Sequence, residues 1–284
     1  MEKIAPALLD WFYRNRRSLP FRDDPTPYHI WVSEIMLQQT RVAAALPYYE
    51  RFIRELPDIP ALAACPPERL DKLWEGLGYY RRVHSMQKAA QQVCRQYGGH
   101  LPASYDALLA LPGIGPYTAG AIASIGFGLA APAVDGNVLR VFARLYNDSG
   151  PITDPAVKKR FTQRVMEHQP PDAPGDYNQA LMELGALVCL PGGAPLCAQC
   201  PLAALCEGRK AGAAEALPCK AAPKPRRVLP VTVALVQNAA TGEWLLQKRP
   251  EGGLLAGLWQ PPAFEGRQLG GPAGRQALAA LGLG

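Results

Sequence analysis

Apolar residues recur every three to four positions along most of residues 4–206, and this spacing predicts α-helices. Leu8 and Phe12, for example, fall on one face of the first such segment. No stretch before residue 206 shows the alternation of apolar and polar residues that is typical of strands. We therefore expect a mostly α protein whose first domain is all-α, with helices at residues 4–16, 30–46, 62–74, 81–97, 105–111, 117–125, 137–146, 155–168 and 176–189.

The pattern changes after residue 206. Residues 207–230 are rich first in alanine and then in proline and basic residues, which is the composition of a linker. Apolar runs at 231–236 and 244–247, separated by a turn, predict two β-strands beyond it. We expect an all-α domain at 1–206, a linker at 207–230 and an incomplete α+β domain at 231–284.

Composition limits the class of protein, its compartment and its kind of partner. The chain has 284 residues, of which 48% are hydrophobic and 19% charged, so it has room for two globular domains. No apolar run approaches the roughly 20 residues of a membrane helix, and the N-terminus lacks the pattern of an export signal. The net charge of +6 favours a polyanionic partner, although charge alone is weak support. We expect a cytoplasmic monomer with no membrane contact.

The segment from Leu111 to Arg140 combines several signals. Pro112, Gly113 and Gly115 interrupt the helical pattern, and Pro116 stands where a first helical residue tolerates a missing N–H. Two short helices joined by a glycine-rich hairpin leave free backbone N–H groups at a positive dipole end, which suits a phosphate. This helix-hairpin-helix pattern predicts a grip on a nucleic-acid backbone, with Gly113 and Gly115 at its tip.

Four of the seven cysteines lie close together near the end of the first domain. Thiolates clustered in a reducing compartment require a cation. A zinc site usually has two closely spaced cysteine pairs, and only one such pair is present here, so a 4Fe–4S cluster fits the spacing better. The expected ligands are Cys189, Cys197, Cys200 and Cys206.

Two carboxylates stand in positions that favour catalysis. Glu34 has apolar neighbours one helical turn away, so burial should raise its pKa toward that of a general acid; a glutamate stabilised by the helix dipole is the alternative. Asp135 precedes a predicted helix and would ordinarily be an N-cap. Its position beside the hairpin also suits an anion that stabilises a sugar cation, which glycosidic chemistry needs beside an acid. Gln39 and Thr40 could meet base edges or form a solvated face.

These motifs together resemble a known family. The stretches Ser33–Thr40, Leu111–Tyr117 and Val134–Asn137, with the cysteine loop, are similar to those of helix-hairpin-helix DNA glycosylases that carry an iron–sulfur cluster. Within them the chain resembles the adenine DNA glycosylases of the MutY type, over nearly its whole length. The linker and the stretch Leu254–Pro262 resemble that family's C-terminal MutT-like (Nudix-like) domain. The expected partner is double-stranded DNA with adenine opposite 8-oxoguanine or guanine, in a bacterial nucleoid.

The resemblance implies roles for individual residues. Glu34 would protonate the adenine, and Asp135 would stabilise the sugar cation with help from Tyr117 and Asn137. Endonuclease III-like relatives carry a lysine where this chain has Tyr117, and a phenol cannot form a Schiff base. The implied activity is therefore that of a monofunctional glycosylase. The residues implied to contact the DNA or the flipped base are Arg22, Gln39, Thr40, Tyr79, Gly113, Gly115 and Glu183. Of these, Arg22 and Glu183 match positions that hold the flipped adenine. Gln39 and Tyr79 match residues that intrude into the duplex near the lesion.

Two other functions compete with this one. One is an endonuclease III-like activity on oxidised pyrimidines, which a lysine at position 117 would have favoured. A non-catalytic module that docks on lesions would not need both Glu34 and Asp135. The first cysteine gap holds seven residues where the family leads us to expect six, and the second domain is short. Weaker discrimination of the lesion than in the family is the expected consequence.

Overall fold

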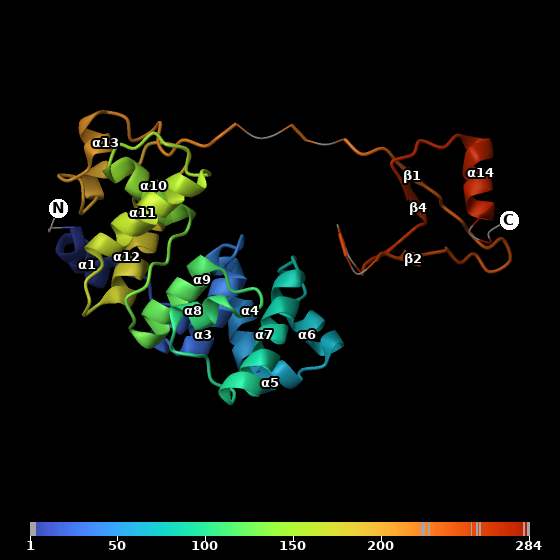
Figure 1. The fold of residues 1–284 in the computed structure, drawn as a ribbon, viewed down its shortest axis with the longest axis horizontal. Coiled ribbons are helices and arrows are strands. Elements are labelled where there is room, and N and C mark those ends of the chain that lie inside the picture. The colour runs from blue at the N-terminus through green and yellow to red at the C-terminus, as the bar shows by residue number, and fades with distance from the viewer. Residues whose placement is uncertain are drawn as a thin grey trace. The chain divides into compact units, whose positions relative to one another are not determined.

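The structure, a computed structural model, describes residues 4–222, 225–226, 228–250, 252–253, 255, 257–280 and 282. Contacts divide the chain into two compact units, Met1–Ala221 and Ala222–Gly284. The first unit is helical, as predicted (Figure 1). None of the described helices is long and apolar enough to cross a membrane. The elements of the first unit are α1 (Ile4–Asn15), α2 (Pro20–Asp23), α3 (Pro27–Met36), α4 (Val42–Glu55), α5 (Ile59–Ala64), α6 (Pro67–Trp74), α7 (Arg81–Tyr97), α8 (Tyr105–Leu109), α9 (Pro116–Ala121), the π-helix η1 (Ile122–Gly126), α10 (Gly136–Leu145), α11 (Pro155–His168), α12 (Pro174–Leu187), the 3₁₀ turn η2 (Cys197–Gln199) and α13 (Glu207–Lys210).

Two hydrophobic cores lie inside the first unit. One is built from residues 19–133, around the fully buried Trp31 and Trp74. The other joins the N-terminal helix α1 to α10, α11 and α12, around Phe12, Phe142 and Tyr177. The side chain of Met182 packs against both cores. Residues held by the two cores therefore meet along a shared boundary, and the candidate site lies there.

The hairpin forms between α8 and α9, as the glycines predict. Gly113 has a φ of +76°, and a Cβ at this position would lie 2.7 Å from the Cβ of Ser85 on α7. Both the left-handed backbone and the close approach require glycine here. Pro116 is the first residue of α9, as expected. The hairpin is thereby packed directly onto the first turns of α7.

Two predicted helices are each broken in two. The pattern at 62–74 is continuous, but Pro66 and Pro67 end α5 and begin α6, because proline disfavours helix at the residue before it. The pattern at 30–46 also continues, yet α3 ends at Met36 and α4 begins at Val42. The intervening residues include Gln39 with a φ of +61°, which no helix allows.

The first unit also extends further than predicted. Residues 207–221 were expected to be linker, but they pack on the helical core. The Arg144 guanidinium donates to the carbonyl of Leu217 at 2.9 Å, and the amide of Ile152 donates to the carbonyl of Cys219 at 2.9 Å. Gly208 lies against the backbone of Arg144, where a Cβ would be 2.5 Å from the carbonyl oxygen. Residues 207–221 make most of these contacts through their backbone. Their side-chain composition therefore resembles that of a linker.

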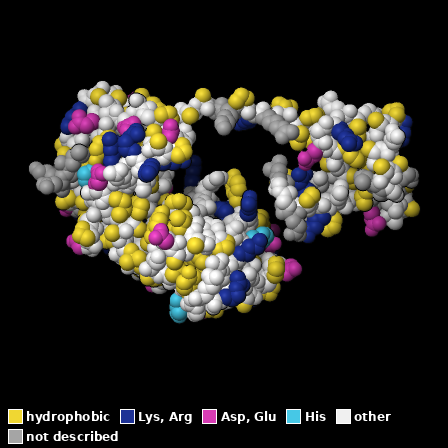
Figure 2. Space-filling view, viewed as in Figure 1, with side chains coloured by type: hydrophobic (Ala, Val, Ile, Leu, Met, Phe, Trp, Pro, Cys, Tyr) yellow, Lys and Arg dark blue, Asp and Glu magenta, His cyan; other side chains and the backbone are white. Residues whose placement is uncertain are grey.

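The second unit holds two small antiparallel pairs and one helix. β1 (Val231–Val233) pairs with β4 (Ala263–Glu265), and β2 (Gln247–Lys248) pairs with β3 (Trp259–Gln260). The helix α14 spans Gly271–Ala279. The predicted strand at 244–247 is mostly absent, because Trp244 forms only an isolated bridge with Gln237. Large apolar side chains of this unit are exposed, as the yellow atoms in Figure 2 show. Of the stretch 254–262, positions 254 and 256 lie outside the described residues.

Candidate active site

Glu34 and Tyr117 meet across the first core. Glu34 lies in the last turns of α3 and is 9% exposed, and Tyr117 is the second residue of α9. The Tyr117 hydroxyl donates a hydrogen bond of 2.5 Å to Oε2 of Glu34. Thr26 caps α3 by accepting from the amide of His29, and Pro116 fixes the start of α9. Local capping therefore aims both side chains at the same point.

The environment of Glu34 favours its protonated form. Burial raises the pKa of this carboxyl, the hydrogen bond from Tyr117 lowers it, and the negative charge of Asp135 raises it again. The resulting pKa is about 7, against an ordinary value of 4.5. A carboxylic acid that is half protonated at neutral pH is suited to donate a proton. This bears out the physical expectation for the Glu34 environment, while its role stays a prediction.

Asp135 ends the extended segment after η1 and caps α10. Its Oδ1 accepts from the amide of Val138 at 2.8 Å, and its Oδ2 accepts from the Asn137 side-chain amide at 2.7 Å. The N-cap interpretation is therefore correct as a structural role. Burial raises the pKa of Asp135, and the hydrogen bonds oppose that rise. Asn137 in turn accepts from Arg140, whose guanidinium also donates to the carbonyls of Gly185 and Cys189.

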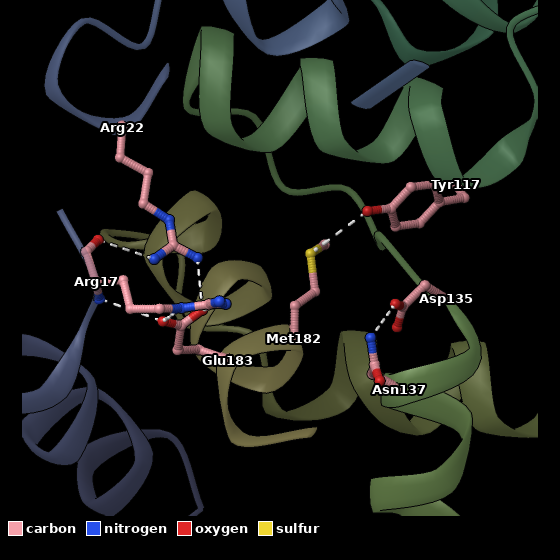
Figure 3. A network of polar contacts seen from close by, with 7 residues as sticks. All are labelled: Arg17, Arg22, Tyr117, Asp135, Asn137, Met182 and Glu183. Carbon is pink, nitrogen blue, oxygen red and sulfur yellow. Dashed lines mark hydrogen bonds and ion pairs between the residues drawn. The ribbon is translucent and has the colours of Figure 1, made fainter. Parts of the chain in front are cut away.

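Glu183 is held by two arginines (Figure 3). Arg17 donates to both carboxylate oxygens at 2.7 Å, and Arg22 donates to Oε2 at 2.8 Å. Burial raises the pKa of Glu183, but the bonds from Arg17 and Arg22 outweigh it and lower the pKa to about 2. The sequence interpretation included Arg22 and Glu183 and missed Arg17. A pair of adjacent arginines before Leu19 was the only signal for it.

Helix α12 carries the residues that join the two halves of the site. Met182 stands between the Glu183 cluster and the Asp135–Asn137 pair (Figure 3), and the Tyr117 hydroxyl lies 3.5 Å from its Sδ. A Cβ on Gly185 would lie 2.6 Å from the Cβ of Asn137, so glycine lets α10 approach closely. Glu34, Tyr117, Asp135, Asn137, Arg22 and Glu183 are thus brought to one region.

The other residues expected to contact DNA lie elsewhere. Gln39, Tyr79 and Gly113 line a cavity of about 350 Å³ whose lining includes neither Glu34 nor Asp135. Gln39 is exposed, and the Tyr79 side chain is 66% exposed. Thr40 follows Gln39 in the loop between α3 and α4, and Gly115 caps α9. Arg81 and Arg82 at the start of α7 also line this cavity. Figure 2 shows basic side chains over α6 and α7, with acidic ones among them.

The four clustered cysteines lie after α12. Burial raises the pKa of the Cys200 thiol to about 11, and the charges of Cys189, Cys197 and Cys206 contribute to the rise. The Arg144 guanidinium donates to Sγ of Cys189 at 3.3 Å. As a donor set, the four thiols suit a thiophilic metal group. Within the described ranges, however, no three His, Cys, Asp or Glu side chains are already arranged to hold an ion.

Base excision repair proteins share the sequence pattern and the fold of this chain. Residues 32–167 match the HhH-GPD superfamily of base excision DNA repair proteins. The fold is similar to that of a solved endonuclease III trapped as a covalent intermediate on DNA, with a TM-score of 0.62 and 25% identity over 75% of this chain and 98% of that one.

Curated relatives narrow the class. The adenine DNA glycosylase of Homo sapiens is 38% identical in an alignment 309 positions long, which covers 90% of this chain and 56% of the human protein. That of Schizosaccharomyces pombe is 30% identical in an alignment 327 positions long, which covers 93% of this chain and 70% of the yeast protein. The chain belongs to the adenine DNA glycosylase family. It spans little more than half the length of the human relative.

Proposed function

We propose that the chain is a monofunctional adenine DNA glycosylase that hydrolyses the N-glycosidic bond of adenine opposite 8-oxoguanine or guanine. The observation that carries this proposal is the placement of Tyr117, which is hydrogen-bonded to Glu34 and interacts electrostatically with Asp135. Burial raises the pKa of Tyr117 well above its ordinary value, so the phenol stays neutral. A neutral phenol supports an acid and an anion without itself attacking the sugar.

In the proposed reaction Glu34 donates a proton to a ring nitrogen of the adenine. The N-glycosidic bond then breaks, and its electron pair leaves with the base. Asp135 stabilises the positive charge that develops on the sugar, and water completes the hydrolysis. The Asn137 side chain holds Oδ2 of Asp135, which orients the carboxylate. The carboxylate of Glu183, fixed by Arg17 and Arg22, offers a hydrogen-bond acceptor to the exocyclic amine of adenine.

We further propose that Cys189, Cys197, Cys200 and Cys206 hold a 4Fe–4S cluster. Such a cluster would fix the segment after α12, and no step of the reaction requires it. The spacing of the four cysteines along the chain and the hydrogen bond from Arg144 to Sγ of Cys189 support this assignment. In the same proposal, residues 231–284 belong to a MutT-like domain and the DNA is bound by a monomer.

Cleavage can be tested with duplexes that carry adenine opposite 8-oxoguanine, followed by alkali to reveal abasic sites. We expect strand breaks only after alkali, because a monofunctional enzyme leaves the strand intact. The Glu34→Gln variant should bind the duplex and release no adenine. Breakage without alkali would instead support an endonuclease III-like activity, and equal cleavage by Glu34→Gln would remove the acid from the proposal.

A further inference from the structure

Gln39 and Tyr79, which are exposed and line the same cavity, both have a left-handed backbone, with φ values of +61° and +48°. Neither is glycine, and a non-glycine residue in this region persists only when its surroundings hold it. Both side chains face solvent. Contacts on the buried side of the two turns must therefore hold the backbone.

The guanidinium of Arg82 lies between the two turns. Its Nη1 donates to the carbonyl of Ile35 at 2.8 Å and to that of Gln38 at 2.6 Å. Its Nη2 donates to the carbonyls of Leu77 and Gly78 at 3.1 and 3.2 Å. Each of the two terminal nitrogens therefore holds one turn.

Two of the carbonyls that accept hydrogen bonds from Arg82 belong to the peptide groups directly before the two left-handed residues. The carbonyl of Gln38 belongs to the peptide group that precedes Gln39, and the carbonyl of Gly78 belongs to the one that precedes Tyr79. Fixing these peptide groups fixes the direction in which each following residue leaves the turn. The bond to Ile35 also satisfies a free carbonyl at the end of α3 and helps to end that helix.

Aromatic rings complete the arrangement. The Arg82 guanidinium carbon lies 5.3 Å from the ring centre of Trp74 and 5.5 Å from that of Tyr79. Contacts of this kind hold a planar cation in one orientation. A lysine could donate to one or two of these carbonyls, but its point charge cannot span both turns or stack on the rings.

We propose that Arg82 is a positioning residue that presets Gln39 and Tyr79 as a rigid wedge for the DNA stack. This inference rests on the proposed function, because a glycosylase must take the adenine out of the stack to reach its N-glycosidic bond, and an inserted wedge offsets the cost of unstacking. Because Arg82 orders both turns in the free protein, the entropy cost of ordering them does not arise when DNA binds. Arg82 itself touches no DNA base in this proposal and acts through the two residues that it holds.

The test compares Arg82→Lys with Arg95→Lys, the same change at an exposed position on the same helix. The probe is a duplex with 2-aminopurine beside the adenine opposite 8-oxoguanine. Fluorescence reports unstacking, anisotropy reports affinity, and a single turnover reports cleavage. For Arg82→Lys we expect the fluorescence rise to be lost and cleavage to fall on the order of tenfold, with affinity changed by less than about threefold. Arg95→Lys should match the wild type in all three.

A second variant keeps the proposal testable if Arg82→Lys does not fold. Gln39→Ala/Tyr79→Ala changes only exposed side chains and should also lose the fluorescence rise. Adding Arg82→Lys to it should lower cleavage no further. A retained rise in either variant, or a further fall on the order of tenfold in the triple variant, would overturn the proposal. Absence of cleavage by the wild type with a normal fluorescence rise would instead count against the proposed function alone.

Discussion

The hydroxyl of Tyr117 donates a 2.5 Å hydrogen bond to Oε2 of Glu34, a residue 83 positions earlier in the chain. The bond favours the ionised carboxylate, while burial favours the neutral acid and has the larger effect. Tyr117 therefore sets how far the pKa of Glu34 rises, and it limits that rise to about 7. A single phenol thus links the geometry of the hairpin helix to the protonation of the proposed acid.

Replacing Tyr117 by phenylalanine should move the pH dependence of cleavage. The variant loses the hydrogen bond that lowers the pKa of Glu34, so that pKa should rise above about 7. Because the protonated acid is the active form, the fall in single-turnover rate at high pH should begin at a higher pH than in the wild type. Rates measured from pH 5 to 9 test this. A profile unchanged by the substitution would show that Glu34 does not titrate in the reaction.

Glu34→Gln should stabilise the protein at high pH. A carboxyl whose pKa is raised from 4.5 to about 7 binds more protons folded than unfolded, so wild-type stability falls as pH rises through this window. The amide has no proton to lose. At about 1.4 kcal/mol per pKa unit, the advantage of the variant should grow by about 3 kcal/mol between pH 4 and pH 8. Urea unfolding at both values measures it, and a constant difference would contradict the burial argument.

Sequence patterns predicted the elements whose signals are local. Helix α7 begins at Arg81 and ends at Tyr97, and α11 begins at Pro155 and ends at His168, as predicted. The helix pattern at 30–46 missed the break after Met36. The carbonyls at this break accept hydrogen bonds from Arg82, which lies 44 to 47 residues away in the chain. No periodicity within the segment records such a contact.

In the candidate site, too, residues with a local sequence signal could be predicted, and a residue with a distant partner could not. Glu34 and Asp135 could be selected from their immediate neighbours, since an apolar helical face and a helix start are both visible in the sequence. Arg17 could not, because its partner Glu183 lies 166 residues further along. Which of several arginines reaches a buried carboxylate depends on how α1 packs on α12, and this packing is a property of the whole core.

Glu183→Gln should destabilise the fold by removing the partner of two arginines. Breaking a fully buried pair costs roughly 3 to 5 kcal/mol. Since the Arg17 side chain is 38% exposed, we expect a smaller loss of about 2 kcal/mol at pH 7. The pKa of Glu183 is lowered to about 2, so the wild-type advantage is present above pH 4.5 and fades as pH falls toward 2. The difference in unfolding free energy between wild type and variant should therefore be smaller at pH 3.5 than at pH 7. A difference independent of pH would refute the ion-pair account.

Cys200→Ser should lower the iron content of the purified protein and its visible absorbance. Serine removes one thiolate from the proposed ligand set but keeps the size of the side chain. Cys94→Ser is the matched control, since Cys94 lies on α7 and is not among the four clustered cysteines. Iron analysis and absorbance spectra of the three proteins provide the measurement. Equal iron in all of them, or none in the wild type, would remove the cluster from the proposal.

Gly120→Ala should be strongly destabilising because α9 packs against the segment that leads to Asp135. A Cβ on Gly120 would lie 1.8 Å from the carbonyl oxygen of Pro132, so one of the two backbones must move. That segment is also tied to α12 by Asn178, whose side-chain amide donates to the carbonyl of Ala131 at 2.8 Å. Overpacking of this kind costs about 1 to 3 kcal/mol.

Gly115→Ala provides the comparison for this last change. Gly115 precedes α9, has a φ of −93°, and leaves open space where a Cβ would stand. Alanine there should cost at most about 1 kcal/mol, as at other N-cap positions. Because the displaced segment ends at Asp135, Gly120→Ala should also lower the single-turnover rate at temperatures where the variant remains folded. Unfolding curves and cleavage assays at 15 °C and 25 °C separate the two effects. Equal losses of stability for both glycines would show that the segment yields freely and does not fix Asp135.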